Sequence, residues 1–218
     1  MFRRYRNWEL GEFVVVFADT AAGGGDYCAA QFLSKTKMDF PLVYHSQTIA
    51  SEMTPLLHLE LEAIYDVTHV RPVIAYERNN GGVYELERLA GMNRNDKYVI
   101  YQEKSNIGSI LKTEDQPKLG WTTTTANRPA MLSMWKDAFD KKLPKIYDRP
   151  TIQEHFSFVI VQTSSSWKAQ AEVGSHDDLV MASAGAWQLY QSEHPTVVQG
   201  VINATPQDLE LDEFGMYT

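Results

Sequence analysis

The sequence predicts an α/β domain built on a mixed five-stranded central sheet, with three antiparallel strands followed by parallel strands and helices on its faces. Three short apolar runs follow one another over residues 13–45 with only turns between them, which is typical of an antiparallel meander. From residue 52 onward, stretches of helical periodicity alternate with short apolar runs, which indicates parallel strands joined by crossovers. A length of 218 residues, 44% of them hydrophobic, fits one domain with a sizeable core.

The meander begins at residues 13–17, an apolar run of the kind found in a strand that is covered on both faces. The glycine-rich loop 21–26 turns this strand back, and residues 27–34 and 41–45 supply the second and third strands. Residues 1–11 carry several arginines but no apolar periodicity, so we expect a linker or terminal arm there.

The parallel part of the sheet is expected to follow an amphipathic helix over residues 52–65, whose apolar residues recur at helical spacing. A strand is predicted at 73–76, a second helix at 83–89 and the fifth strand at 97–102. Residues 105–120 are polar and irregular, which predicts a mobile loop.

The next segment is expected to be a helix preceded by an extended stretch at residues 121–125. Asn127 would cap this helix and Pro129 would lie in its first turn. Residues 157–162 and 167–172 alternate apolar and polar side chains, as expected for an additional β-hairpin.

The last predicted helix spans residues 177–190, and its small residues would let it pack close to the sheet. The acidic residues that follow are expected to be a loosely attached tail over 195–218. The globular domain is therefore predicted to span residues 12–194.

Acidic residues stand at three places where a predicted strand ends or a predicted helix begins. Asp19 follows the first strand, Glu77 follows the strand at 73–76, and Asp177 and Asp178 open the last helix. Each has an ordinary interpretation, Asp19 as a turn former and Glu77 as a residue at a strand end. If the fold gathers them, however, their repulsion calls for hard divalent cations. Two Mg²⁺ or Mn²⁺ ions held by Asp19, Glu77 and Asp178 would support phosphodiester hydrolysis.

The adjacent aspartates are expected to differ in role, because consecutive helical side chains point about 100° apart. We favour Asp178 as the metal ligand and Asp177 as a helix cap, a supporting group or an additional ligand. Ser175 and Asp178 also approximate a capping box, which would explain one aspartate without a metal. Asp26 and His176 are further candidate ligands, with a turn-ending residue and a polar helix-start residue as their ordinary interpretations.

The formal charge of −8 argues against tight DNA binding by this chain alone, because phosphate contacts supply most of the affinity for DNA. Five basic residues are nevertheless predicted to flank the carboxylates and to contact the DNA backbone, with solvated surface charge as the alternative: Lys35, Lys37, Arg78, Arg94 and Lys97. The single cysteine excludes an internal disulfide and a cysteine-based zinc site. No apolar stretch is long enough to span a membrane and no signal peptide is recognisable, so a soluble intracellular protein is expected.

Four motifs, in this order, give the chain a specific resemblance: FADTAAGGGDY, AYERNNGG, GWTTTTANRPAML and GSHDDLVMA. Together they resemble the nuclease domain of the large subunit of viral DNA-packaging terminases, including those of tailed bacteriophages, over residues 13–190. The resemblance implies a ribonuclease H-like fold and a two-metal endonuclease that cuts concatemeric double-stranded viral DNA during genome packaging. It also implies a packaging ATPase domain, a portal and a terminase small subunit as partners, in the host cytoplasm. No Walker-type GK[ST] occurs, so the chain resembles the nuclease half alone.

Two other functions are compatible with the same residues. Another ribonuclease H-like nuclease, such as a Holliday-junction resolvase or an RNA–DNA hybrid nuclease, would use the same carboxylates on a different substrate. A non-catalytic docking domain would use the acidic cluster only to bind a structural metal ion.

Overall fold

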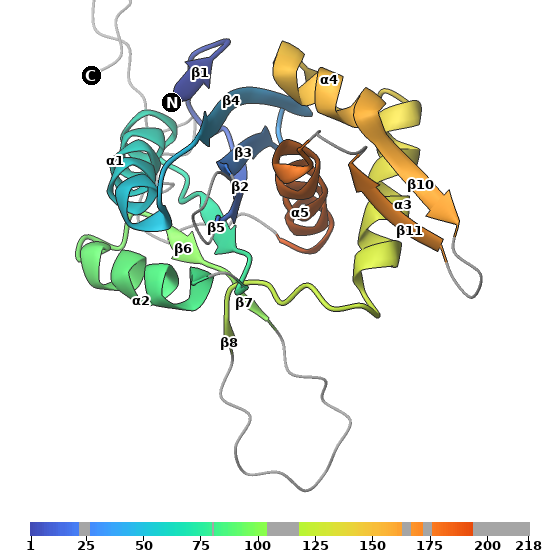
Figure 1. The fold of residues 1–218 in the computed structure, drawn as a ribbon. Coiled ribbons are helices and arrows are strands. Elements are labelled where there is room, and N and C mark those ends of the chain that lie inside the picture. Colours follow the sequence, from blue (N-terminus) through green and yellow to red (C-terminus); the bar gives the residue numbers. More distant parts are fainter. Residues whose placement is uncertain (22–26, 80, 104–117, 163–166, 172–175, 194–218) are drawn as a thin grey trace, which may run out of the picture.

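The computed structural model describes residues 1–21, 27–79, 81–103, 118–162, 167–171 and 176–193 (Figure 1). The glycine-rich loop with Asp26, most of the predicted loop 105–120 and the acidic tail 195–218 lie outside these residues. None of the described helices is both long and apolar enough to cross a membrane.

A seven-stranded mixed sheet forms the centre of the fold, with the order β1-β4-β3-β2-β5-β6 and with β9 also paired to β4. Strands β2, β3 and β4 are antiparallel neighbours, whereas β5 pairs in parallel with β2 and β6 in parallel with β5. The strands of this sheet are β1 (Phe2–Arg4), β2 (Val14–Asp19), β3 (Cys28–Ser34), β4 (Asp39–Ser46), β5 (Val73–Tyr76), β6 (Val99–Ile100) and β9 (Lys145–Ile146). Strands β2 to β6 are the five that the sequence predicted, and their mixed order is confirmed.

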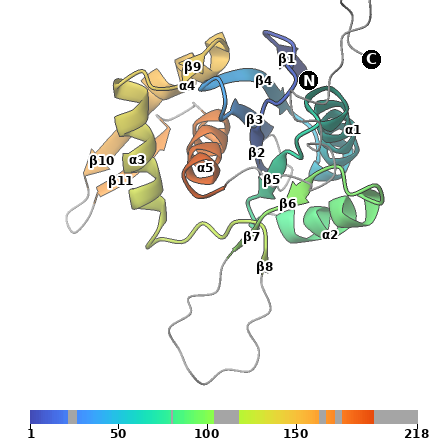
Figure 2. The same ribbon diagram turned by 180° about the vertical axis from the view of Figure 1, so that it is seen from behind.

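Helices cover both faces of the sheet (Figures 1 and 2). The helices are α1 (Ala50–Thr68), α2 (Gly82–Met92), α3 (Arg128–Asp140), α4 (Arg149–Ser157) and α5 (Asp178–Ser192). Alternate residues of β2 face opposite layers: Val14 and Val16 join the core under α1 and α2, whereas Val15 and Phe17 join the core under α3 and α5. Two small two-stranded sheets complete the fold: β7 (Gln102–Glu103) with β8 (Lys118–Leu119), and β10 (Phe158–Gln162) with β11 (Trp167–Ala171).

Helix α5 lies directly against β2 and β3 because its central residues are small. A Cβ atom on Gly185 would lie 2.4 Å from the Phe17 ring, so a larger residue does not fit at this position. The neighbouring Ala184 and Ala186 are fully buried. The close packing against the sheet is the one that the sequence predicted, and it places the first turn of α5 near the end of β2.

The N-terminal residues are part of the fold, whereas the sequence predicted a linker or arm at 1–11. Strand β1 pairs with the edge of β4, and the Nε of Arg3 lies 2.5 Å from Oδ1 of the fully buried Asp148. Arg6 forms further ion pairs with Glu12 and Asp39. Ion pairs with residues distant in sequence stabilise this strand, so the local sequence contains no apolar pattern that would predict it.

Further local differences separate the structure from the prediction, among them strand β8, which lies in the predicted loop 105–120. The short elements β9 and α4 were not predicted. Helix α4 is capped by Asp148, whose side chain accepts a hydrogen bond from the N–H of Thr151 at 2.9 Å. Asn127 occupies the N-cap position of α3, but its side chain makes no capping bond, so the predicted cap is wrong. Its Oδ1 instead accepts a hydrogen bond from the N–H of Thr124, and its Nδ2 donates to the carbonyl of Thr122.

Candidate active site

The carboxyl ends of the two parallel neighbours β2 and β5 bring the first two predicted carboxylates together. Asp19 is the last residue of β2, and Glu77 follows β5 directly. In the register between these strands Ala18 is opposite Tyr76, and the N–H of Glu77 donates to the carbonyl of Ala18 at 2.8 Å. Carboxyl ends of parallel strands meet at one edge of a sheet, so residues 58 positions apart in sequence become neighbours.

The first turn of α5 adds the remaining predicted carboxylates to the same edge. Asp178 is the first residue of α5 and Asp177 precedes it, and both line a cavity of about 700 Å³ together with Asp19 and Glu77. The other residues that line this carboxylate cavity are Thr20, Ala21, Asn79, Arg128, His176 and Met181. Three segments far apart in sequence therefore supply acidic groups to one cavity.

The electrostatics of the cavity make its negative charge costly. The pKa of Asp19 is raised well above its ordinary value, first by burial and then by the negative charges of Glu77 and Asp178. Glu77 is 8% exposed, whereas the Asp178 side chain is 18% exposed. Carboxylates placed in this way are stabilised by a bound proton or by cations.

The donor set fits hard divalent cations by its chemistry. Three carboxylates supply the oxygen ligands that Mg²⁺ and Mn²⁺ prefer, and Arg128 is the only lysine or arginine among the described residues that line the cavity. Among the described residues, however, no three His, Cys, Asp or Glu side chains are already close enough to enclose an ion. The side chains of Asp19, Glu77 and Asp178 would have to move toward one another on metal binding.

The turn after β5 orients Glu77, and the sequence did not single out this function. Asn79 donates from Nδ2 to Oε1 of Glu77 at 2.8 Å, and its carbonyl accepts a hydrogen bond from the Thr20 hydroxyl. A Cβ atom on Gly82 would lie 1.8 Å from the Glu77 carbonyl oxygen, so this turn requires glycine. The run AYERNNGG signalled a turn, but not the contact between an amide and the carboxylate.

The start of α5 is held by two residues from other helices. Arg128, the first residue of α3, donates from Nη2 to Oδ2 of Asp177 at 3.1 Å. The carboxylate of Glu154 in α4 accepts a hydrogen bond from the N–H of Leu179 at 2.9 Å and so caps α5, whereas Asp177 makes no side-chain cap bond. Burial, with the nearby charge of Asp178, raises the pKa of Glu154 to about 7.

Comparison with solved structures identifies the fold. No family model and no curated protein sequence matches this chain. The magnesium-bound large terminase nuclease of the thermophilic phage G20c superposes with a TM-score of 0.63 at 14% identity and 88% coverage of both chains. The large terminase nuclease domain of Thermus phage P74-26 gives a TM-score of 0.62 at 14% identity, covering 88% of this chain and 87% of that one. The manganese-soaked human cytomegalovirus terminase nuclease domain gives 0.52 at 12% identity and 84% coverage of both.

The chain has the terminase nuclease fold. The likeness extends from phage to herpesvirus domains at identities of 12–14%, so it concerns the arrangement of elements and not the side chains. It confirms the fold class that the four motifs predicted. The G20c domain has been solved with bound magnesium, cobalt and zinc, and these ions are a property of that domain.

His176, a further candidate metal ligand, lies at the rim of the carboxylate cavity in this nuclease fold. Its Nδ1 lies 3.8 Å from Oδ2 of Asp178, and its ring packs edge-on against Tyr27 at 4.9 Å between centroids. Nearly half of its side chain is exposed. Asp26, the other candidate, lies outside the described residues.

The five predicted DNA-binding residues do not lie together on the nuclease fold. Arg78 adjoins Glu77, and its guanidinium donates to the Leu119 carbonyl. Lys35 and Lys37 follow β3, whose end at Ser34 is opposite Val14 at the far end of β2 from Asp19.

Arg94 and Lys97 precede β6, at the amino ends of the parallel strands, where Lys97 pairs with Asp66 at 2.6 Å. Only Arg78 of the five predicted residues therefore flanks the carboxylate edge. A role for these residues in DNA binding stays a prediction.

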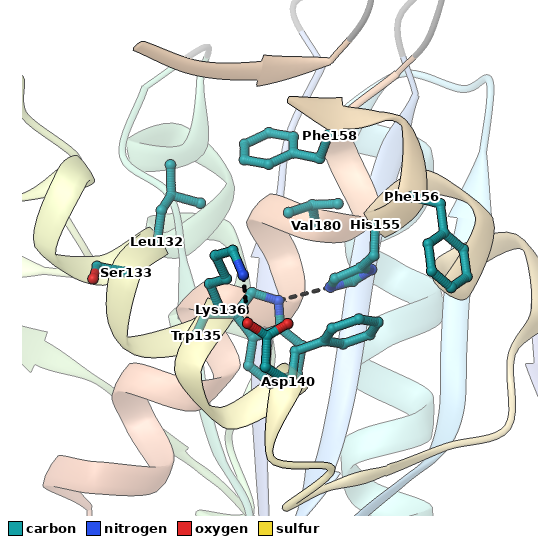
Figure 3. A pocket seen from close by; sticks show the side chains of 10 residues that line it. Leu132, Ser133, Trp135, Lys136, Asp140, His155, Phe156, Phe158 and Val180 are labelled. Carbon is teal, nitrogen blue, oxygen red and sulfur yellow. Dashed lines mark hydrogen bonds and ion pairs between the residues drawn. The ribbon is translucent and has the colours of Figure 1, made fainter. Parts of the chain in front are cut away.

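A second cavity, of about 530 Å³, has an apolar lining (Figure 3). It lies among α3, α4 and α5, with Phe139, Phe158 and Val180 on its walls. The Trp135 indole donates to Nε2 of His155 at 2.7 Å, so Nδ1 carries the proton and donates to the Thr151 carbonyl at 2.6 Å. Burial lowers the pKa of His155 to about 4. We call this cavity the apolar pocket.

Proposed function

We propose that this chain is a metal-dependent endonuclease that cuts double-stranded DNA during viral genome packaging. One observation carries the proposal: Asp19, Glu77 and Asp178, from three distant segments, line one cavity at the carboxyl edge of a terminase nuclease fold. The three carboxylates would hold two Mg²⁺ or Mn²⁺ ions. When bound, these ions would supply an activated water and would stabilise the departing 3′ oxygen, so the products would be a 5′-phosphate and a 3′-hydroxyl.

The chain's own residues position this chemistry. Asn79 fixes the direction of the Glu77 carboxylate through the 2.8 Å hydrogen bond to Oε1. The cap that Glu154 places on α5 fixes the backbone from which Asp178 projects. In an isolated strand end or helix start these carboxylates would sample many directions, so both contacts reduce the cost of forming a metal site.

The wider setting of the proposal follows the fold resemblance. The substrate would be concatemeric viral DNA, and the partners would be a packaging ATPase domain, a portal and a terminase small subunit in the host cytoplasm. No Walker-type GK[ST] occurs in these 218 residues, so the ATPase activity is assigned to a separate domain or chain. Because the net charge is −8, we expect weak, salt-sensitive DNA binding with little sequence preference.

Plasmid cleavage tests the function. The chain is incubated with supercoiled plasmid in Mn²⁺ or Mg²⁺, with and without chelator, beside Asp19→Asn and Asp66→Asn. Asp66 is a matched control because its carboxylate, which pairs with Lys97, is 56% exposed and lies outside the cavity. We expect metal-dependent nicking and linearisation by the wild type and by Asp66→Asn only.

Three results would contradict parts of this proposal. No cleavage with any divalent metal would support a docking domain with a structural ion. Cleavage confined to four-way junctions or to RNA–DNA hybrids would support another ribonuclease H-like nuclease. Equal activity of Asp19→Asn and the wild type would remove the site assignment.

A further inference from the structure

The carboxylate cavity presents an electrostatic problem for a DNA substrate. Four carboxylates line it, and Arg128 is the one lysine or arginine that the described lining contains. Metal ions would offset part of the negative charge, but a phosphate that approaches past Asp177 still meets a carboxylate whose charge is offset only by its pair with Arg128. A fixed cation at the rim would lower this repulsion.

The backbone around Arg128 is firmly held at this rim. The segment before α3 is anchored beside β5, since the N–H of Arg78 donates to the Trp121 carbonyl at 2.8 Å. The side chain of Asn127 ties the same segment together by accepting from the Thr124 N–H at 2.7 Å. The Arg128 N–H in turn donates to the Thr124 carbonyl at 3.0 Å. Asn127 therefore serves to shape this segment and not to cap α3.

The guanidinium of Arg128 keeps most of its hydrogen-bonding capacity. Among the described residues its side chain makes one hydrogen bond, from Nη2 to Oδ2 of Asp177 at 3.1 Å, and the side chain is 33% exposed. An arginine has five N–H donors, and a planar guanidinium suits two oxygens of a phosphate better than a single carboxylate oxygen. Within the described part of the chain, the buried Nε of Arg128 has no hydrogen-bond partner. Among the described residues the guanidinium is therefore only partly hydrogen-bonded, and the exposed third of the side chain is accessible to a ligand.

We propose that Arg128 is a DNA-phosphate site at the rim of the carboxylate cavity and that Asp177 holds its guanidinium in place until DNA arrives. This inference rests on the proposed function for its substrate, but not on the catalytic step. Arg128 is a positioning residue: it would bind a non-bridging oxygen of the DNA backbone and so set where the duplex enters. Asp177 is then the partner of Arg128, whereas Asp178 faces the metal chemistry.

The simpler alternative is that the pair of Arg128 and Asp177 only braces α3 against α5. A brace is lost equally when either partner is changed, and its loss lowers the melting temperature without altering the number of phosphate contacts. A phosphate site gives opposite results for the two partners, since removing the Asp177 charge frees the guanidinium for DNA.

Equilibrium binding separates these two possibilities. Labelled duplexes of two unrelated sequences are titrated in Ca²⁺ at several salt concentrations with wild type, Arg128→Gln, Arg128→Lys and Asp177→Asn. Arg71→Gln is the matched control, because Arg71 also pairs with a single aspartate, Asp96, but outside the cavity. Melting temperatures are recorded for every variant.

Arg128→Gln should bind both duplexes roughly tenfold more weakly, and the slope of log K against log salt should fall by about 0.9, which corresponds to one lost phosphate contact. Arg128→Lys should keep the slope and recover part of the affinity, since it keeps the charge but not the planar donor set. Asp177→Asn should bind at least as tightly as the wild type. Arg71→Gln should keep the wild-type affinity and slope.

Equal loss of affinity in Arg128→Gln and Asp177→Asn, with an unchanged salt slope, would overturn the phosphate site and support the brace. If Arg128→Gln fails to fold, a tenfold loss in Asp177→Asn still overturns the inference. Binding does not require cleavage, so the result holds even if plasmid cleavage fails. Failure of plasmid cleavage with normal Arg128-dependent binding would count against the proposed nuclease and not against the phosphate site.

Discussion

The carboxylate cavity and the apolar pocket share helix α5 but have opposite chemistry. Asp178 and Met181 line the carboxylate cavity, whereas Val180, one residue away, lines the apolar pocket. Adjacent helical residues point in different directions, so two sides of the same helical turn border a region that stabilises the fold and one that costs stability. The apolar pocket gains free energy from buried aromatic groups, while the carboxylate cavity concentrates like charges. Unfavourable electrostatics of this kind typically mark the functional site.

The largest expected difference between the two cavities is the effect of a substitution on DNA cleavage. Asp19→Asn should lower plasmid cleavage by about a thousandfold or more, because metal ions supply several kcal/mol of transition-state stabilisation. In chelator its melting temperature should equal or exceed that of the wild type, since the nearly isosteric amide relieves repulsion from Glu77 and Asp178. A large fall in melting temperature would instead make Asp19 a structural turn residue.

The apolar pocket should show the reverse behaviour. Trp135 is 2% exposed, so Trp135→Ala should lower the free energy of unfolding by about 3–5 kcal/mol, measured by urea denaturation. Phe156 lines the same pocket but is 77% exposed, and Phe156→Ala should cost less than about 0.5 kcal/mol. The stabilisation of Trp135→Ala by Mn²⁺ should match that of the wild type. A lost response to Mn²⁺ would mean that the two cavities are coupled through α5.

Divalent cations should stabilise the fold by binding at the carboxylate cavity and not at the apolar pocket. Mg²⁺ or Mn²⁺ at a hundred times its dissociation constant should add about 2.7 kcal/mol to the stability of the wild type, and chelator should remove this gain. Glu77→Gln should reduce the gain, whereas Trp135→Phe should not. Ca²⁺ should also stabilise the fold but inhibit cleavage, because it is larger and tolerates irregular coordination. Rapid cleavage in Ca²⁺ alone would contradict the two-metal proposal.

The sequence predicted the carboxylate cavity better than the groups around it. Asp19 and Glu77 end apolar runs that are recognisable as strands, and the parallel pairing of β2 with β5 brings them together without further information. Asn79 belongs to a turn and Arg128 begins helix α3, and their contacts depend on partners that only the folded chain brings near. Arg128 and Asp177, for example, are 49 positions apart.

Four of the five basic residues lie away from the carboxylate edge where the sequence predicted them, and strand direction explains the difference for Lys35 and Lys97. Lys35 follows a strand that runs antiparallel to β2, so it emerges at the opposite edge from Asp19. Lys97 precedes a strand parallel to β5 and emerges at that same far edge. Strand order and direction were part of the prediction, whereas positive charge alone does not say at which edge a residue lies.

Strand β1 was missed for a different reason. Its residue Arg3 pairs with Asp148, which is 145 positions away in the sequence, so the local sequence gives no sign of the contact.

The pH dependence of stability should have opposite signs in the two cavities. Burial lowers the pKa of His155 from 6.5 to about 4, so the folded chain holds the neutral ring; the stability this gives is complete above pH 6.5 and is lost as pH falls toward 4. The pKa of Asp19 is raised, so without cations its contribution is present at low pH and is lost as pH rises through that pKa.

Urea denaturation in chelator between pH 4 and 8 measures both contributions. His155→Gln should flatten the loss of stability as pH falls below 6.5, and Asp19→Asn should flatten the loss of stability that accompanies rising pH. If neither variant changes the shape of the profile, the two cavities are not the source of the pH dependence.

The smallest expected effect concerns the two aspartates at the start of α5. Asp177→Ala should cost less than about 1 kcal/mol of stability, because Asp177 makes no cap bond and its pair with Arg128 is about one third exposed on each side. Asp178→Ala should abolish cleavage, whereas Asp177→Ala should retain part of it. Thermal melts and plasmid cleavage of both variants decide the assignment. If Asp177→Ala abolished cleavage while Asp178→Ala did not, Asp177 would be the metal ligand and its contact with Arg128 would have to break when metal binds.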